Sequence, residues 1–229
     1  MITQIYSIKN AQEALAVIEA GADYIGVVPW QVRADGVLPG STTEKDCEEI
    51  CAAARGRAKL VFLSTCDDEQ FYYDMAVKYK PDVIHVTGNH LTVSAPFCRQ
   101  LKELVPGIRV MQAVPMSGPE AIELAKEYAK TADLLILDSV VAGAPEVGAV
   151  GKTHDWELDR RIVEAVDIPV IIAGGLGPDN VAEAIRYVKP WGVDSMTKTD
   201  RFLPDGTHLR EKDIEKVRQF CAAAKAAGK

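Results

Sequence analysis

The chain has 229 residues, and 33 acidic against 26 basic side chains give it a formal net charge of -7. With 48% hydrophobic residues, a chain of this length can bury a sizeable core, which excludes a disordered protein. The negative balance, without any long basic run, argues against nucleic acid or an anionic membrane surface as a partner.

The cysteines and the apolar runs narrow the class further. The chain has five cysteines, an odd number at irregular spacings, and they are Cys47, Cys51, Cys66, Cys98 and Cys221. We expect free thiols rather than disulfides, no metal site and no other cofactor. No signal peptide is visible at Met1, and the apolar runs are far shorter than the ~20 residues of a membrane helix. A cytoplasmic protein is therefore expected.

Short β-branched runs alternate with longer amphipathic ones along the whole chain, a pattern typical of repeated βα units around a parallel sheet. The strands predicted are Thr3 to Tyr6, Tyr24 to Val28, Lys59 to Leu63, Val83 to Thr87, Arg109 to Ala113, Leu134 to Asp138, Pro169 to Ala173 and Gly192 to Met196. The helices predicted are Asn10 to Ala20, Thr43 to Arg55, Glu69 to Tyr79, Thr92 to Leu104, Gly118 to Thr131, Glu157 to Val166, Gly177 to Val188 and Glu211 to Ala226.

A doubly wound open sheet also alternates strand and helix, but it normally has five or six strands. Eight regularly spaced units favour a closed (β/α)8 TIM barrel, and no linker composition divides residues 1–229, so we predict one α/β domain. Function is then expected on the loops that follow the strands.

The strongest motif follows the seventh predicted strand, where an apolar run enters Gly174 and Gly175. Consecutive glycines let the backbone approach a ligand closely, and the start of the next helix attracts an anion; a simple tight turn is the alternative. Barrel phosphate sites are frequently built by the loops after strands seven and eight. The phosphate-binding residues predicted are Gly174, Gly175, Ser195, Met196, Thr197 and Lys198.

Other candidates lie on, or in the loops after, the second, fourth and sixth predicted strands. Asp138 ends an apolar strand and is a candidate general acid or base, with a loop-capping aspartate as the alternative. His85 could face the barrel mouth or be a satisfied buried histidine. Arg33 could contact an anion or be a solvated charge. Gly151 belongs to a loop that could cover the substrate; a nucleotide-binding P-loop is excluded there because Glu146 occupies the position of its first glycine.

At these positions the sequence resembles the phosphoribosylanthranilate isomerase family. The segment Glu19 to Gly26 is similar to the family's Glu-Ala-Gly-Ala-Asp-x-Ile-Gly, and Leu134 to Ser139 is similar to its Leu-Leu-Leu-Asp-Ser. The loop Gly148 to Trp156 resembles Gly-Gly-Thr-Gly-x-x-Phe-Asp-Trp, and Ala173 to Val181 resembles Ala-Gly-Gly-Leu-x-Pro-x-Asn-Val. The similarity extends over nearly the whole chain.

The resemblance implies a TIM barrel that catalyses an Amadori rearrangement, in which an acid opens the ribose ring of an aminoaldose phosphate and a base removes the C2 proton. Carried over, Asp138 is the general acid, the loops named above hold the phosphate, and Arg33 lies where the family has a substrate-contacting arginine. The family acts without a metal or cofactor on a small phosphorylated substrate, and such barrels are monomers or homodimers.

The sequence departs from the family where the base should be. The family opens with Lys-Ile-Cys-Gly and uses that cysteine, whereas this chain has Tyr6 at the cysteine's position. His85 replaces a glutamine that contacts substrate, and its ordinary pKa near ~6.5 would suit a relocated base. The family's Ser-Ser-Gly phosphate loop becomes Met196, Thr197 and Lys198.

These departures suggest a related phosphosugar isomerase or epimerase with Asp138 and His85 as the proton-transfer pair. The alternatives are an authentic phosphoribosylanthranilate isomerase with an unusual base, a non-catalytic sugar-phosphate-binding barrel, and a lyase that uses Lys198 or Lys152 as a Schiff-base amine.

Overall fold

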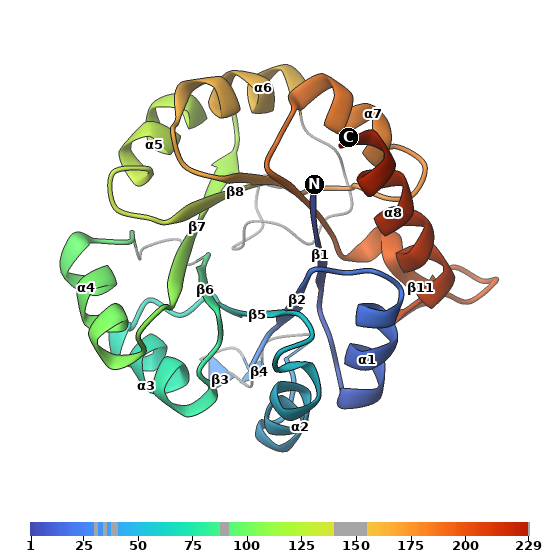
Figure 1. Cartoon of the computed structure of the whole chain (residues 1–229), viewed down its shortest axis with the longest axis horizontal. Helices are drawn as coiled ribbons and strands as arrows, with labels where there is room; N and C mark the ends of the chain where they lie inside the picture. The colour runs from blue at the N-terminus through green and yellow to red at the C-terminus, as the bar shows by residue number, and fades with distance from the viewer. Residues whose placement is uncertain (30–31, 34–35, 38–40, 88–91, 140–154, 229) are drawn as a thin grey trace.

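Eight parallel strands close into a barrel that is surrounded by helices, which confirms the predicted (β/α)8 architecture (Figure 1). The computed structural model describes residues 1–229 except 30–31, 34–35, 38–40, 88–91, 140–154 and 229. The barrel order is β1-β10-β9-β8-β7-β6-β5-β2. Its strands are β1 (Ile2–Tyr6), β2 (Tyr24–Val27), β5 (Lys59–Ser64), β6 (Val83–Val86), β7 (Arg109–Met116), β8 (Leu134–Ser139), β9 (Val170–Ile172) and β10 (Gly192–Ser195).

Helices follow the barrel strands in the predicted order, although most are shorter at their ends than predicted. They are α1 (Ala11–Glu19), α2 (Glu44–Ala54), α3 (Glu69–Tyr79), α4 (Ala95–Leu104), α5 (Ala121–Tyr128), α6 (Trp156–Ala165), α7 (Val181–Val188) and α8 (Ile214–Ala227). Local signals fix several starts: the side chains of Asn10, Thr43 and Ser94 each accept a backbone N–H from the first turn of α1, α2 and α4. None of the helices that the structure describes has the length and apolar character needed to cross a bilayer.

The first and last barrel strands meet directly and complete the circle. β1 pairs in parallel with both β2 and β10, and the register aligns Gln4 with Tyr24 on one side and with Asp194 on the other. Because all eight strands run the same way, the residues that end them gather at one rim of the barrel.

The apolar core has two layers. The larger one fills the space between the strands and the helices, with fully buried residues such as Phe62, Tyr72 and Phe97. A smaller cluster, which includes Val61, Met111 and Ile171, fills the barrel itself.

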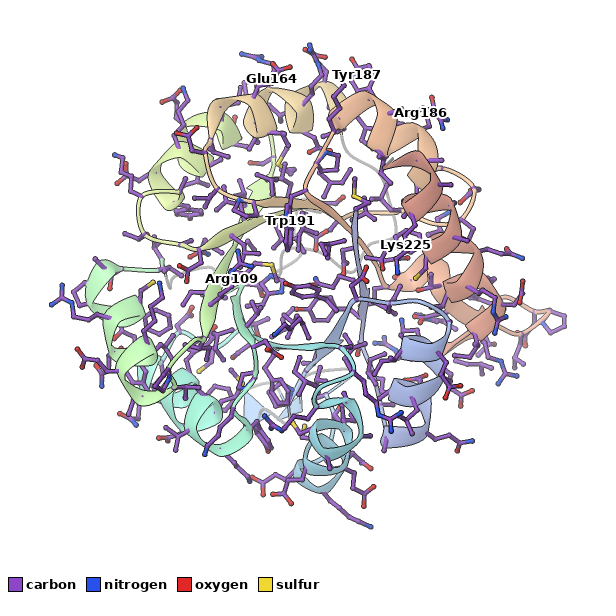
Figure 2. The ribbon with its side chains drawn as sticks, viewed as in Figure 1. Arg109, Glu164, Arg186, Tyr187, Trp191 and Lys225 are labelled. Carbon is purple, nitrogen blue, oxygen red and sulfur yellow. The ribbon has the colours of Figure 1, made fainter. Side chains whose placement is uncertain are left out.

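The opposite rim of the barrel, where the strands begin, is filled by aromatic and cationic side chains. Trp191 meets Tyr24 edge to face at 6.0 Å between ring centroids, and the Arg109 guanidinium lies 5.7 Å from the Trp191 ring (Figure 2). The site must therefore lie at the rim where the strands end.

Two short hairpins were not predicted from the sequence. One pairs β3 (Val32–Arg33) with β4 (Gly36–Val37), and the other pairs β11 (Asp200–Phe202) with β12 (His208–Lys212). The helix predicted from Glu211 was wrong at its start, because residues 211 and 212 belong to β12. The last helix begins only after Asp213, whose carboxylate accepts the N–H groups of Glu215 and Lys216.

Candidate active site

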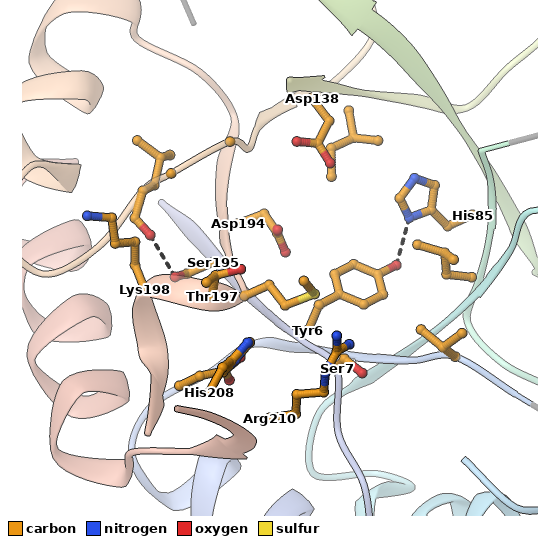
Figure 3. Close-up of a pocket in the computed structure, with 18 of the residues that line it drawn as sticks. Tyr6, Ser7, His85, Asp138, Asp194, Ser195, Thr197, Lys198, His208 and Arg210 are labelled. Atoms are coloured by element: carbon orange, nitrogen blue, oxygen red, sulfur yellow. Dashed lines mark hydrogen bonds and ion pairs between the residues drawn. The ribbon is translucent and has the colours of Figure 1, made fainter. Parts of the chain in front are cut away.

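A cavity opens at the rim where the strands end (Figure 3). It lies among the loops that follow β1, β8, β9 and β10, with the β11–β12 hairpin along one side. The residues that line it are Tyr6, Ser7, Lys9, Val28, Leu63, Thr65, His85, Ile136, Asp138, Gly174, Gly175, Leu176, Asp194, Ser195, Met196, Thr197, Lys198, Asp200, His208 and Arg210. The structure thus brings Tyr6, His85, Asp138 and all six predicted phosphate residues to one cavity.

The glycine loop after β9 has a backbone conformation that requires its glycines. Gly174 and Gly175 have φ angles of 78° and 64°, in the left-handed region that other residues rarely adopt. Asn180 holds the loop in place, since its side-chain amide donates to the Gly175 carbonyl at 3.1 Å and its carbonyl accepts the Gly177 N–H at 2.8 Å. The loop is therefore ordered around a backbone that can approach a ligand closely.

The loop after β10 lies beside the glycine loop in the wall of the cavity. The Ser195 hydroxyl donates to the Leu176 carbonyl at 2.7 Å, so it links the two loops. Thr197 begins a short 3-10 turn, Thr197–Thr199. Neither the Gly175 N–H nor the Thr197 N–H donates to a backbone or side-chain acceptor within the described part of the chain. These two backbone donors suit an anion, whereas Figure 3 shows the Lys198 ammonium pointing away from Asp138 and Asp194.

Tyr6 and His85 form a buried pair across the barrel mouth. The Tyr6 hydroxyl and His85 Nδ1 are 2.8 Å apart, and the two side chains are only 4% and 3% exposed. The Tyr6 ring lies against the backbone of Gly26 on β2, where a Cβ atom would come within 2.0 Å of the ring. This close packing fixes the Tyr6 ring at the sequence position where the resembling family has its cysteine.

Burial sets the protonation state of this pair. It lowers the pKa of His85 to about 3, so the imidazole is neutral at pH 7 and is a weak base. The sequence-based expectation of an ordinary pKa near ~6.5 was wrong, because a position inside the barrel removes water from the ring. Burial also raises the pKa of Tyr6 well above its usual value, and the charges of Asp194 and Asp138 add to this effect. His85 Nε2 has no hydrogen-bond partner among the described residues.

Two carboxyl groups point into the same space, as Figure 3 shows. Asp138 is the penultimate residue of β8 and accepts the N–H of Ser139 at 2.8 Å. Asp194, on β10, is buried and accepts the side-chain amide of Gln4 at 3.1 Å. Burial first and the charge of Asp138 second raise the pKa of Asp194 to about 8, although the hydrogen bond from Gln4 opposes the increase. At neutral pH Asp194 therefore holds a proton.

The β11–β12 hairpin adds charged groups beside the loop after β10. The buried Lys212 ammonium lies 2.5 Å from one Asp200 carboxylate oxygen, and His208 Nε2 lies 2.7 Å from the other. Lys212 also donates to the Met196 carbonyl at 3.2 Å. Burial lowers the pKa of Lys212, while Asp200 opposes that decrease. The hairpin thus supports the loop that was predicted to bind phosphate.

Two predicted substrate contacts cannot be placed in the site. Arg33 is the second residue of β3, and the structure describes its backbone but not its side chain. Gly151 lies outside the described residues. Within the described ranges there is no group of three or more His, Cys, Asp or Glu side chains that could hold a metal ion.

Sequence reasoning assigned no role to several residues that line the cavity or hold its carboxyl groups. Asp194, His208 and Arg210 line the cavity but are not among the residues predicted from the sequence. The available signal was the Pro204-Asp205-Gly206 turn followed by alternating residues, which is typical of a hairpin and would have brought His208 and Arg210 to this face. Gln4 carried no signal without the strand register.

Comparisons with known proteins agree with this geometry. A family model described as N-(5'-phosphoribosyl)anthranilate (PRA) isomerase matches residues 3–197. The N-(5'-phosphoribosyl)anthranilate isomerase of Methanocella arvoryzae is 31% identical over 209 residues, which is 91% of each chain. That of Haloferax volcanii is 32% identical over 225 residues, or 98% of this chain and 93% of the relative. A solved structure of monomers generated from the dimeric Thermotoga maritima enzyme has a TM-score of 0.75 at 25% identity, covering 99% of this chain and 100% of that one.

Proposed function

The chain belongs to the N-(5'-phosphoribosyl)anthranilate isomerase family and is an isomerase of the aldose-ketose type, and from that premise we propose that it rearranges N-(5'-phosphoribosyl)anthranilate itself. The observation that carries the proposal is one cavity in which a pair of carboxyl groups, Asp138 and Asp194, faces the two loops suited to phosphate. The names of the relatives support this substrate over other phosphorylated sugars.

We propose that the phosphate lies between the glycine loop and the loop after β10. The N–H groups of Gly175 and Thr197 would donate to phosphate oxygens, while Gly174 permits the close approach and Met196 completes the wall. Ser195 and Lys198 were predicted as direct contacts; the hydroxyl of Ser195 is already bonded to Leu176, so we assign it to holding the loops together.

For the proton transfers we propose the carboxyl pair. Asp138 remains the general acid, and it shares with Asp194 a proton that burial keeps in the site at neutral pH. The pair protonates the ring oxygen as the nitrogen lone pair displaces the C1–O bond, which gives the open-chain protonated imine. The carboxylate left behind then takes the C2 proton, and the resulting enolamine becomes the ketose. One pair of carboxyls can thus serve both steps in the absence of the family's thiol.

His85 then has a different role from the base that the sequence suggested. A neutral imidazole that accepts the Tyr6 hydroxyl at Nδ1 carries its hydrogen on Nε2. Because Nε2 has no partner in the described part of the structure, it can donate to an oxygen of the substrate. We propose that Tyr6 fixes the tautomer of His85 and that His85 positions the substrate.

Turnover of N-(5'-phosphoribosyl)anthranilate by the purified protein tests the proposal, together with growth of a tryptophan auxotroph that lacks this step. We expect Asp138→Asn and Asp194→Asn each to lower kcat by at least a hundredfold, because a general acid or base typically contributes 10²–10⁴-fold. Asp205→Asn, on the exposed turn of the β11–β12 hairpin, is the matched control and should retain full activity. No product and no growth would refute the proposal.

A second candidate is a related isomerase or epimerase for a phosphorylated sugar without the aromatic amine. The observation that favours it is the Tyr6 ring, which fills space at the end of β1 where the family has a smaller cysteine. A panel of phosphorylated aldoses and ketoses distinguishes the two: turnover of a simple sugar phosphate, without turnover of the anthranilate compound, would establish it. Saturable binding of sugar phosphates without any product would instead indicate a non-catalytic barrel.

A further inference from the structure

The cavity has a cationic side chain that lies beyond the end of the matched family model. Arg210 lies on β12 and lines the cavity, whereas the family model ends at Thr197. Figure 3 shows its guanidinium pointing from β12 toward Tyr6 and Ser7.

The backbone around Arg210 is irregular in a way that directs this side chain. Between the paired positions Asp200 with Lys212 and Phe202 with His208, β11 has one residue and β12 has three, so β12 bulges at residues 209–211. Arg210, in the middle of the bulge, has a φ of 55°, in the left-handed region. Residues other than glycine, asparagine and aspartate rarely adopt this conformation, and bulges beside active sites commonly redirect a side chain.

Arg210 is also uncompensated. Its guanidinium makes no hydrogen bond or ion pair with any other residue that the structure describes. It raises the local positive potential instead: burial lowers the pKa of the neighbouring Lys9, and the charges of Lys212 and Arg210 lower it further, against the effect of Glu13. Arg210 is exposed at the mouth of the cavity, so its guanidinium is free to turn toward an anionic ligand that enters there.

Two other cationic or ionisable side chains of the cavity already have hydrogen-bond partners. The Lys9 ammonium donates to the Ser7 hydroxyl at 3.0 Å, and His208 is bonded to Asp200. Lys198 points away from the carboxyl pair, as noted above. The backbone donors of the two phosphate loops are neutral, and a cationic side chain that can turn to a phosphate dianion would add a stronger, charge-assisted hydrogen bond.

We infer that Arg210 binds the phosphate group of the substrate, so that the β11–β12 hairpin is the outer wall of the phosphate site. This inference rests on the proposed function only in placing a phosphate in the cavity. It assigns to Arg210 the charge that the sequence had suggested for Lys198, and it makes the bulge of β12 part of the ligand site.

The test is binding of ribose 5-phosphate and inorganic phosphate, measured by calorimetry on the full chain. Arg210→Gln should weaken ribose 5-phosphate binding by about tenfold or more, the usual value of a charge-assisted hydrogen bond. Arg201→Gln removes the same charge from the same hairpin, where Arg201 pairs with Glu211 at the surface, and should change the affinity less than twofold. Ribose, without a phosphate, should not distinguish the two variants.

Arg210→Gly separates loss of the cation from damage to the fold. Glycine adopts a φ of 55° without strain, so the melting temperature of Arg210→Gly should not fall below that of the wild type. Its affinity for phosphate should fall as it does in Arg210→Gln. Unchanged affinity in both Arg210 variants, or a wild type that binds neither probe, would overturn the inference. Normal turnover of the anthranilate substrate, with unchanged phosphate affinity in the Arg210 variants, would refute this inference and leave the proposed function intact. Weakened phosphate binding in the variants, without any turnover by the wild type, would support this inference and refute the proposed function.

Discussion

Replacing Asp194 by asparagine should remove a strong pH dependence from the stability of the protein. The carboxyl is buried at the join of β1 and β10, where it accepts the Gln4 amide. Asparagine has nearly the same shape and keeps a carbonyl oxygen for that hydrogen bond, but it cannot ionise. A difference between the two proteins that varies with pH therefore reports the ionisation of Asp194.

The direction and size of the effect follow from the two pKa values of Asp194, which are about 8 in the folded chain and 3.8 without the fold. Between these values the folded state holds a proton that the unfolded state has released, so rising pH favours unfolding. The stabilising contribution is fully present below pH 3.8 and is lost as the pH rises through about 8. At about 1.4 kcal/mol per pH unit, the loss across the window is on the order of 6 kcal/mol.

Urea unfolding of the wild type and Asp194→Asn, from pH 4 to pH 9, measures this difference. The free energy of unfolding of the wild type should fall relative to the variant by about 1.4 kcal/mol per pH unit up to about pH 8, and the two curves should then run parallel. The free energy of unfolding of Gln4→Lys should depend less steeply on pH than that of the wild type, because an ammonium beside the Asp194 carboxyl lowers its pKa. Parallel curves between pH 5 and pH 8 would refute the assignment of the proton to Asp194.

Three further predictions concern other buried groups. His85→Gln should remove an effect of opposite sign, because the pKa of His85 is about 3 in the folded chain against an ordinary value of 6.5. As the pH falls from 6.5, the wild type should therefore lose about 1.4 kcal/mol of stability per pH unit relative to the variant. A constant difference between the two proteins in urea titrations would contradict this. Gly26→Ala should cost about 1–3 kcal/mol because its Cβ would overlap the Tyr6 ring, and a double-mutant cycle with Tyr6→Cys should show most of that cost relieved; additive costs would be inconsistent with the contact. Lys212→Met should cost about 3–5 kcal/mol in chemical denaturation at pH 7 by leaving the Asp200 carboxylate buried without its ammonium, whereas a cost below about 1 kcal/mol would show that His208 compensates fully.

The barrel was predictable from the sequence because its signals are local and repeated. Each strand is a short apolar run, and each helix has its own periodicity and often its own capping residue, so eight units could be recognised independently. The β11–β12 hairpin was missed because Glu211 and Lys212 are good helix formers beside a true helix. Asp213, as the N-cap, marks the boundary that the composition obscured.

The members of the candidate site were partly predictable, but their protonation was not. Asp138, Gly174 and Gly175 were found because strand ends of a parallel barrel share one rim. The pKa values of His85 and Asp194 depend on burial and on neighbours from other strands, and neither is visible in the sequence around the residue.

The pairing of β1 with β10 has a consequence for how the protein is made. Gln4 and Asp194 are 190 positions apart, so the residue that orients the buried carboxyl leaves the ribosome long before the carboxyl itself. Until β10 is synthesised, one edge of β1 is unpaired and the region that will become the cavity is open to water. An incomplete barrel therefore lacks the buried Asp194 carboxyl. The site therefore forms only when β10, the last strand of the barrel, is in place, and a nascent chain halted before β10 should neither bind nor transform the substrate.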